Sequence, residues 1–282
     1  MVEIHEWDAV DTAALLRKPT ADDHKYSRGV LGVRTGSQEY PGAAVLGVEA
    51  AWRTGIGMVR YLGPDRPADL VLQRRPETVT APGRVQAWLI GSGTDATTRP
   101  PAETARLEEL LQGDVPVVVD AGALDLVPGA RAPLVVTPHR SEHARLRGLL
   151  GLDDTDATTL ADRVSAARET AAAAGIAVLL KGAETVVAAP DGWSTVVRAG
   201  TGWLATAGTG DVLGGVLGSI VAARAADREL EAAQLARLAA AAAYIHGHAA
   251  RAAAAGPITA LDVAEAVPAV IGTLLSGGDP AR

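Results

Sequence analysis

The sequence contains no cysteine, no phenylalanine and only 3% aromatic residues. Without cysteine, the chain can form neither a disulfide framework nor a thiolate metal site, and it has no cysteine nucleophile. The scarcity of aromatic side chains leaves few platforms on which nucleic-acid bases could stack. Basic residues are also in the minority, with 26 Lys and Arg against 33 Asp and Glu and a net charge of −7. We therefore expect no nucleic-acid or membrane partner, and any phosphate ligand must be held by local features.

The N-terminus and the apolar runs argue against export and membrane insertion. Residues 1–8 lack the basic and apolar regions of a signal peptide, and the apolar runs elsewhere are interrupted well before membrane-spanning length. We therefore expect a cytoplasmic protein. With 282 residues, 48% of them hydrophobic, the chain can bury a large core in one domain. This domain is expected over residues 25–275, between an N-terminal extension over residues 1–24 and a flexible tail over residues 276–282.

Short apolar stretches alternate with longer helical patterns from about residue 30 to residue 220. This alternation is typical of a parallel sheet covered by helices on both faces. The expected fold is a three-layer α/β/α domain with a mostly parallel central sheet and C-terminal helices. Strands are expected at residues 30–33, 58–62, 85–90, 115–119, 134–136 and 176–180, followed by a hairpin of residues 185–189 and 194–198. Helices are expected at residues 42–55, 212–225, 230–254 and 261–275.

The segment Gly208-Thr209-Gly210-Asp211 leads directly into an apolar helix. Its glycines let backbone N–H groups turn toward one point, and the N-terminus of a helix adds about half a positive charge, which favours an anion. Asp211 would lie at the edge of this anion hole, where it could accept a proton from a hydroxyl that takes part in phosphoryl transfer. Alternatively, Asp211 only caps the helix, a position where Asp is common. The motif alone does not decide between the two interpretations.

Polar residues and glycines follow several predicted strands at the point where each strand ends. His139 follows one strand, and Glu142, three residues later, offers the carboxylate that Mg²⁺ prefers. Lys181 and Gly182 end another strand, where a lysine can meet a nucleotide phosphate as a point charge. Gly91-Ser92-Gly93 follows a third. Each could be a surface turn or a cap, but together they line the edge where open parallel sheets bind ligands.

Two other clusters of polar residues carry less weight. His246 and His248 are two residues apart on a predicted helix and point in different directions, so we do not expect them to bind zinc. Asp120 and Asp125 fall at a strand end and a helix start, which argues against one acid/base pair. Asp120 is the better candidate for a site residue.

The order of these segments makes the sequence, from about Lys25 to Ala250, resemble the ADP-dependent (S)-NAD(P)H-hydrate dehydratases, a family of ribokinase-like proteins. Three positions depart from the family pattern: Ser92 replaces the usual proline, Ala207 stands where glycine is common, and Gly122 stands where a second aspartate is frequent. The resemblance rests on six segments: Tyr40-Pro41-Gly42-Ala43-Ala44, Gly91-Ser92-Gly93, Thr137-Pro138-His139 with Glu142, Lys181-Gly182-Ala183-Glu184-Thr185, Ala205-Thr206-Ala207-Gly208-Thr209-Gly210-Asp211 and Tyr244-Ile245-His246-Gly247.

The resemblance implies a role for each candidate site residue. It makes Asp211 the catalytic base and gives the Thr209 and Gly210 amides the task of stabilising the transferred phosphoryl group. Mg²⁺, for which Glu142 is the candidate ligand, would neutralise the remaining phosphate charge. The hydrated nicotinamide nucleotide would contact Ala43, Gly93, His139 and Asp211. The adenine nucleotide would contact Lys181, Gly182, Ala183, Glu184, Thr185 and Gly210.

The implied reaction is the repair of a damaged coenzyme by a hydro-lyase. The family removes water from (6S)-hydrated NADH or NADPH while ADP, its co-substrate, is cleaved to AMP and phosphate. The resemblance also implies a homo-oligomer, most simply a tetramer. We expect a separate protein to supply the epimerase activity that accompanies this repair, because the 24 residues before Lys25 are too few for an epimerase domain.

Two other functions are compatible with the same fold. A small-molecule kinase acting on a hydroxymethylpyrimidine or a hydroxyethylthiazole would use the anion hole and the aspartate equally well. Such a kinase would release a stable phosphorylated product. A non-catalytic nucleotide sensor would instead bind ADP without turnover.

Overall fold

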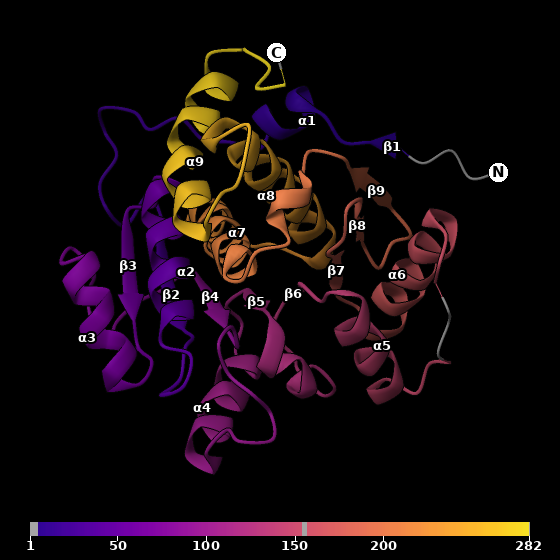
Figure 1. Ribbon diagram of the computed structural model, residues 1–282. Helices are drawn as coiled ribbons and strands as arrows, with labels where there is room; N and C mark the ends of the chain where they lie inside the picture. The colour runs from indigo at the N-terminus through magenta and orange to yellow at the C-terminus, as the bar shows by residue number, and fades with distance from the viewer. Residues whose placement is uncertain (1–4, 154–156, 282) are drawn as a thin grey trace.

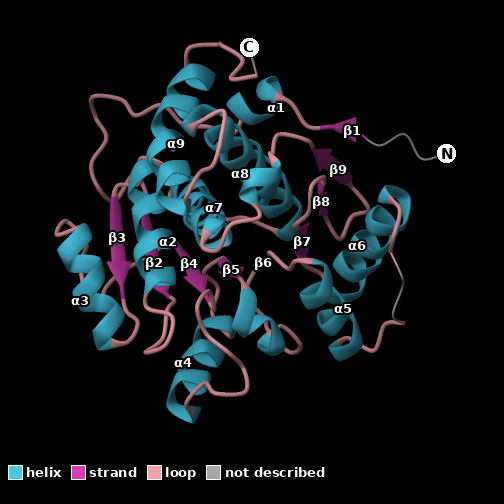
Figure 2. Cartoon of the chain, viewed as in Figure 1, coloured by secondary structure: helices cyan, strands magenta, loops and turns pink. Residues whose placement is uncertain are grey.

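The computed structural model describes residues 5–153 and 157–281, and in this part of the chain nine strands form one sheet with helices on both faces, as Figure 1 and Figure 2 show. The strands lie in the order β1-β9-β8-β7-β6-β5-β4-β2-β3. They are β1 His5–Glu6, β2 Val30–Arg34, β3 Met58–Tyr61, β4 Ala87–Ile90, β5 Val117–Val119, β6 Leu134–Val136, β7 Ala177–Leu180, β8 Thr185–Ala188 and β9 Ser194–Val197. The helices are α1 Ala9–Ala13, α2 Gly42–Arg53, α3 Asp65–Arg74, α4 Pro101–Leu111, α5 Arg140–Leu149, α6 Leu160–Ala174, α7 Thr209–Ala225, α8 Ala232–Ala253 and α9 Ala260–Leu275, with the 3-10 helices η1 Ala121–Leu126 and η2 Gly202–Leu204.

The three-layer α/β prediction is confirmed. The six strands expected between residues 30 and 180 are all present, and the central ones are short runs of buried valine, leucine and isoleucine, as strands covered on both faces require. β7, β8 and β9 form the antiparallel part of the sheet, with the expected hairpin between β8 and β9. β2, β4, β5, β6 and β7 are parallel neighbours, so their carboxyl ends meet at one edge.

The sheet also has an edge strand that the sequence did not predict. β1 pairs in parallel with β9, and the side chain of Trp7, which follows it, is buried. The indole Nε1 of Trp7 donates a hydrogen bond to Thr12 Oγ1 in α1 at 2.9 Å. Residues 5–13 of the expected extension therefore pack onto the domain. At the other end, the Tyr244 hydroxyl lies 3.4 Å from Asp279 Oδ1 in the expected tail.

Two hydrophobic clusters cover the two faces of the sheet. One packs α2, α7, α8 and α9 against the first face, and the other packs α4, η1, α5 and α6 against the second. Glycines bring α2 and α7 into close contact, because a Cβ at Gly215 would collide with the carbonyl of Gly47. This close packing carries the start of α7 to the carboxyl edge of the sheet. Within residues 5–153 and 157–281, no helix is long and apolar enough to cross a membrane.

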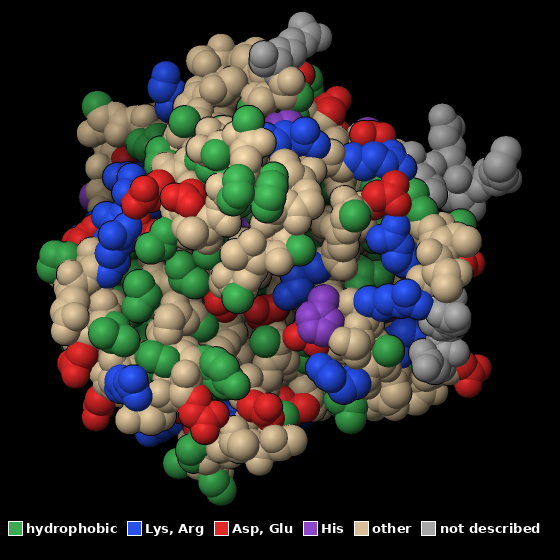
Figure 3. All heavy atoms as spheres, viewed as in Figure 1, with side chains coloured by type: hydrophobic (Ala, Val, Ile, Leu, Met, Phe, Trp, Pro, Cys, Tyr) green, Lys and Arg blue, Asp and Glu red, His purple; other side chains and the backbone are tan. Residues whose placement is uncertain are grey.

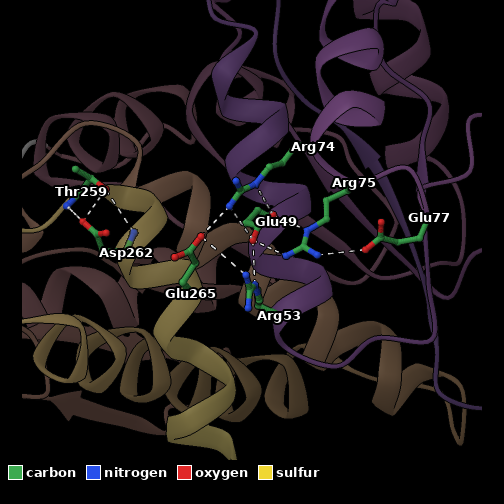
Figure 4. A network of polar contacts seen from close by, with 8 residues as sticks. All are labelled: Glu49, Arg53, Arg74, Arg75, Glu77, Thr259, Asp262 and Glu265. Atoms are coloured by element: carbon green, nitrogen blue, oxygen red, sulfur yellow. Dashed lines mark hydrogen bonds and ion pairs between the residues drawn. The ribbon is translucent and has the colours of Figure 1, made fainter.

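A network of charged side chains joins α2, α3 and α9 (Figure 4). The Glu49 carboxylate is fully buried and accepts hydrogen bonds from Arg53, Arg74 and Arg75. Arg74 also pairs with Glu265 of α9 at 2.8 Å. Burial would raise the pKa of Glu49, but the guanidinium groups outweigh it and hold the pKa at about 2.

Candidate active site

Helix α7 begins at Thr209, three residues before the predicted start. Gly208 is its N-cap and has a φ of +91°, a conformation that favours glycine. The Thr209 hydroxyl donates to the carbonyls of Leu204 and Thr206 at 2.8 and 2.9 Å and so fixes the loop before the helix. The interpretation of Asp211 as the N-cap is wrong, because Asp211 lies inside the first turn and the cap makes no side-chain hydrogen bond.

The anion hole differs in one respect from the expectation. The Thr209 N–H already donates to the Thr206 carbonyl at 3.3 Å. The Val212 N–H bonds to the Gly208 carbonyl at 3.2 Å, as the helix begins. The first N–H groups of a helix precede its hydrogen-bond ladder, so the amides of Gly210 and Asp211 are the ones that face an incoming anion. Thr209 contributes the shape of the loop.

The carboxyl group of Asp211 has an environment suited to a proton acceptor. Burial raises its pKa, the negative charge of Asp120 raises it further, and the positive charge of Lys181 opposes both, which leaves the pKa at about 7. A carboxyl group with this pKa exchanges protons readily near neutral pH. A perturbed carboxyl group beside a helix N-terminus is also a feature of catalytic sites.

Lys181 lies between the acidic residues of the edge and the start of α7. Its Nζ is 2.9 Å from Asp120 Oδ1 and 3.9 Å from Glu142 Oε2. A Cβ at Gly210 would lie 3.6 Å from the same Nζ, so the ammonium group is next to the anion hole. Burial lowers the pKa of Lys181, but the nearby carboxylates outweigh burial and the net pKa is raised. The lysine is therefore a fixed positive charge beside the helix.

His139 and Glu142 meet at the start of α5. His139 is the N-cap, and its Nδ1 accepts hydrogen bonds from the Glu142 N–H at 3.3 Å and lies 3.1 Å from the Ser141 hydroxyl. In return, the His139 N–H donates to Glu142 Oε2 at 2.7 Å. Helix α5 is thus capped by a histidine. His139 Nε2 lies 3.3 Å from Glu142 Oε1, and the side chain is still half-exposed, so a ligand can contact it.

Ala43 and Gly93 are also brought together, from α2 and from the turn after β4. Gly93 has a φ of +67°, and a Cβ there would approach the Ala43 methyl group to 2.5 Å. The preceding residue, Ser92, is buried and lies beside α7, 3.8 Å from where a Cβ of Gly214 would be. The close approach to Ala43 requires glycine at position 93. Through Ser92, the turn after β4 also lies beside α7, the helix that carries Asp211.

The segment 181–185 forms the exposed turn between β7 and β8. Gly182 and Ala183 are exposed, and Thr185 begins β8. The Glu184 carboxylate pairs with Arg163 at 2.7 Å and with Arg198 at 2.9 Å, so it orders the turn. Beside this turn is a cavity of about 630 Å³ whose lining includes His139, Arg163 and Lys181. Figure 3 shows acidic side chains deep in a hollow of this face, with a histidine and basic side chains on its rim.

Two relationships were not accessible from the sequence. Asp125 pairs with Arg99 at 2.7 Å, whereas Asp120 pairs with Lys181 at 2.9 Å. His246, on α8, is buried next to the backbone of Thr209, and burial lowers its pKa to about 4. The late helix therefore places a neutral imidazole beside the glycine loop that precedes α7. No local sequence signal pairs residues so far apart.

A dedicated protein cage for a metal ion does not fit this site. Among the described residues, no group of three or more His, Asp or Glu side chains could hold a metal. Glu142 offers a carboxylate at the edge, 3.9 Å from Lys181. This donor set suits Mg²⁺, which proteins commonly bind through one or two carboxylates together with substrate phosphates.

The fold is that of a ribokinase-like α/β protein, with a glycine-containing loop at the N-terminus of α7. Its structure resembles that of a ribokinase-like superfamily protein from Enterococcus faecalis with a TM-score of 0.79 at 21% identity, covering 96% of each chain. Residues 31–270 match the model of the NAD(P)H-hydrate dehydratase family. The chain belongs to this family.

Relatives within the family differ in length. The chain is 44% identical over 228 residues to the bifunctional NAD(P)H-hydrate repair enzyme Nnr of Mycobacterium tuberculosis, a match that covers 77% of this chain and 46% of that protein. It thus spans about half the length of such bifunctional relatives. It is 39% identical over 220 residues to the ADP-dependent (S)-NAD(P)H-hydrate dehydratase of Neisseria meningitidis, covering 71% of this chain and 72% of the relative.

A solved structure of an enzyme from Bacillus subtilis is similar over nearly the whole chain. This ADP/ATP-dependent NAD(P)H-hydrate dehydratase was co-crystallised with ATP and Mg²⁺. The TM-score is 0.81 at 26% identity, and the match covers 97% of this chain and all of the other. The ribokinase-like fold expected from the sequence is confirmed by this likeness.

Proposed function

We propose that this protein is an ADP-dependent (S)-NAD(P)H-hydrate dehydratase that restores NADH and NADPH from their (6S)-hydrated forms. The observation that carries the proposal is the position of Asp211. Its carboxyl group, with a pKa of about 7, lies in the first turn of α7 beside the Gly210 amide and close to Lys181. A base and two groups that stabilise phosphate thus occupy one place, in a chain of the dehydratase family.

The first step is phosphoryl transfer from ADP to the ring hydroxyl of the hydrated nicotinamide. Asp211 accepts the hydroxyl proton while the oxygen attacks the β-phosphorus, and the bond from that phosphorus to AMP breaks. The amides of Gly210 and Asp211 and the Lys181 ammonium stabilise the negative charge on the transferred group. In a site partly shielded from water, these fixed dipoles and charges act more strongly than in solution.

The second step is the loss of phosphate. The lone pair of the ring nitrogen expels the phosphate with cleavage of the carbon–oxygen bond, and the neighbouring ring carbon then releases a proton to restore the double bond. The products are the reduced coenzyme, AMP, phosphate and a proton. The chain's contribution here is to keep the leaving phosphate bound at the N-terminus of α7.

The two nucleotides would be bound by two groups of residues at the carboxyl edge of the sheet. Ala43, Gly93 and His139 would contact the hydrated nucleotide together with Asp211, and the contact between Ala43 and Gly93 supports a shared surface. Lys181 to Thr185 and Gly210 would contact ADP. The adjacency of Lys181 Nζ to Gly210 supports this assignment. With Glu184 held by two arginines, the turn would offer mainly its backbone to the nucleotide.

Three further features belong to the proposal. Mg²⁺ would be held by the nucleotide phosphates and Glu142 and would neutralise phosphate charge, which fits the carboxylate that Glu142 offers beside Lys181. The protein would also form a homotetramer and act in the cytoplasm, where the reduced coenzymes are used. Light scattering of the purified protein tests the assembly, and a monomer in solution would contradict the tetramer.

Phosphorus NMR of a reaction with hydrated NADH, Mg²⁺ and ADP or ATP tests the proposed activity. A dehydratase produces free phosphate and reduced coenzyme in equal amounts, with AMP from ADP. A kinase acting on a hydroxymethylpyrimidine or hydroxyethylthiazole would give a stable phosphate ester when those alcohols are supplied. Binding of ADP without any product would instead indicate a nucleotide sensor. Either result would overturn the proposal.

A further inference from the structure

Asp120 is a buried carboxylate that the proposed reaction does not use. It follows the last residue of β5, and its side chain is only 4% exposed. Although Asp120 is the N-cap residue of η1, its side chain makes no capping hydrogen bond. A role as a simple helix cap is therefore excluded, and the carboxylate is directed across the edge of the sheet instead.

Three donors from three other strand ends hold this carboxylate. The Thr137 hydroxyl donates to Oδ1 at 2.7 Å, the Ser92 hydroxyl donates to Oδ2 at 3.0 Å, and Lys181 Nζ donates to Oδ1 at 2.9 Å. Both hydroxyl groups are buried, so neither bond competes with water. The carboxylate can therefore hold the lysine in one place.

The bond from Ser92 comes from a position where this chain departs from the family pattern. In the resemblance described above, proline is usual at this position, and proline has no donor. Here the hydroxyl of Ser92 provides a second anchor for Asp120, in a residue that is 1% exposed. The departure from the family pattern thus strengthens the support of the lysine.

The backbone after Asp120 is tightly constrained. Ala121 has a φ of +45°, a left-handed conformation that is costly for a residue with a side chain. Gly122 follows, and a Cβ there would collide with the carbonyl of Thr94. A second aspartate at position 122 would not fit. Strain of this kind persists where the surrounding structure fixes a functional group.

We propose that Asp120, anchored by Ser92 and Thr137, is a positioning residue that holds the Lys181 ammonium beside Gly210, where it receives the phosphate chain of the adenine nucleotide. The inference rests on the proposed function, because that function makes ADP the ligand. The long lysine side chain has many rotamers, and fixing it before the nucleotide arrives lowers the entropy that binding must remove.

The test is a double-mutant cycle read by calorimetric titration with ADP. Asp120→Asn keeps the size of the side chain but removes the charge that holds the lysine, and Lys181→Met removes the ammonium group. We expect each single variant to bind ADP about tenfold more weakly than the wild type. The double variant should bind no more weakly than Lys181→Met, because Asp120 acts through the lysine.

Asp125→Asn is the matched control, the same change five residues later at a carboxylate paired with Arg99. It should leave the affinity for ADP unchanged. If Asp120→Asn binds ADP as the wild type does while only its unfolding temperature falls, Asp120 has a structural role and the proposal is overturned. Full additivity in the cycle would overturn it as well.

Two further results separate this inference from the proposed function. If Asp120→Asn does not fold, Ser92→Ala and Thr137→Val remove the anchors one at a time, and each should weaken ADP binding about two- to fivefold, because the other anchor still holds the carboxylate. Unchanged affinity in both would contradict the positioning role.

A wild type that binds ADP but does not dehydrate the hydrated coenzymes contradicts the proposed function alone, whereas one that binds no ADP contradicts both.

Discussion

His139 and Glu142 hold each other at the start of α5, each accepting a hydrogen bond from the backbone N–H of the other. This reciprocal arrangement is a capping box in which a histidine takes the place usually filled by serine or threonine. It fixes the Glu142 carboxylate 3.9 Å from Lys181 Nζ. The cap therefore links the stability of α5 to the charge distribution of the site.

Glu142→Gln and Glu142→Ala separate these two contributions. Glutamine can still accept the hydrogen bond of the cap, so Glu142→Gln should unfold at nearly the same urea concentration as the wild type. Glu142→Ala should lose about 1 kcal/mol of stability. Because both variants lack the charge, both should need more Mg²⁺ for half-maximal turnover. An unchanged Mg²⁺ requirement in both would remove Glu142 as the metal ligand.

The activity of the wild type should depend on the ionisation of Asp211. Its pKa of about 7 means that the base is protonated and inactive at lower pH. We expect kcat/KM to fall about tenfold per pH unit well below pH 7. In Lys181→Met the positive charge that lowers this pKa is gone, so the acidic limb should move to higher pH. A profile that stays flat down to pH 5 would contradict the role of base.

Replacing Asp211 should make the fold more stable at neutral pH. In the native state its pKa is raised from 3.8 to about 7, so the native state binds more protons than the unfolded chain between these values and stability falls as pH rises. Asp211→Asn avoids this loss. We expect the variant to exceed the wild type by about 4 kcal/mol at pH 8 and by almost nothing below pH 4, measured by urea unfolding. A less stable variant at pH 8 would refute this account.

The charge network of Figure 4 should contribute strongly to stability. Removing Glu49 leaves three guanidinium groups, which are 21–38% exposed, without the carboxylate that they share, so Glu49→Ala should cost about 1–3 kcal/mol in thermal or urea unfolding. Glu77, whose side chain is 42% exposed, is the control, and Glu77→Ala should change stability by less than about 1 kcal/mol. If both variants lose the same amount of stability, the buried Glu49 carboxylate contributes no more than the exposed Glu77 carboxylate.

The Glu49 pKa of about 2 gives this network a pH dependence. A carboxylate whose pKa is lowered by folding contributes stability above its ordinary pKa of 4.5, and this contribution is lost as the pH falls toward 2. Glu49→Gln should therefore show a weaker acid dependence of unfolding than the wild type. If Glu49→Gln and the wild type show the same acid dependence of unfolding, the lowered pKa of Glu49 would be contradicted.

The sequence predicted the sheet and the order of its strands along the chain because each strand is a local run of apolar residues between turn signals. It did not predict β1, whose two residues, His5–Glu6, are too few to form a pattern and pair with β9 far along the chain. The start of α7 was also misplaced, because its cap is Gly208 in a left-handed conformation and not a residue with a capping side chain.

The position of part of the candidate site could be predicted from the sequence, but its contacts could not. Residues at the ends of parallel strands must converge, so His139 and Lys181 could be placed at one edge. Which of them touch could not be inferred, since the bond between Lys181 and Asp120 joins residues 61 positions apart. The capping role of His139 and the hydrogen bond from Ser92 depend on side-chain geometry in the same way.

The most direct test of the central claim compares wild type and Asp211→Asn in one assay. Each is mixed with hydrated NADH, Mg²⁺ and ADP, and the return of the absorbance of the reduced nicotinamide is followed while ADP binding is measured in parallel. We predict full recovery with the wild type, and no recovery with Asp211→Asn despite nearly unchanged ADP affinity. Recovery at the wild-type rate with Asp211→Asn would contradict the account.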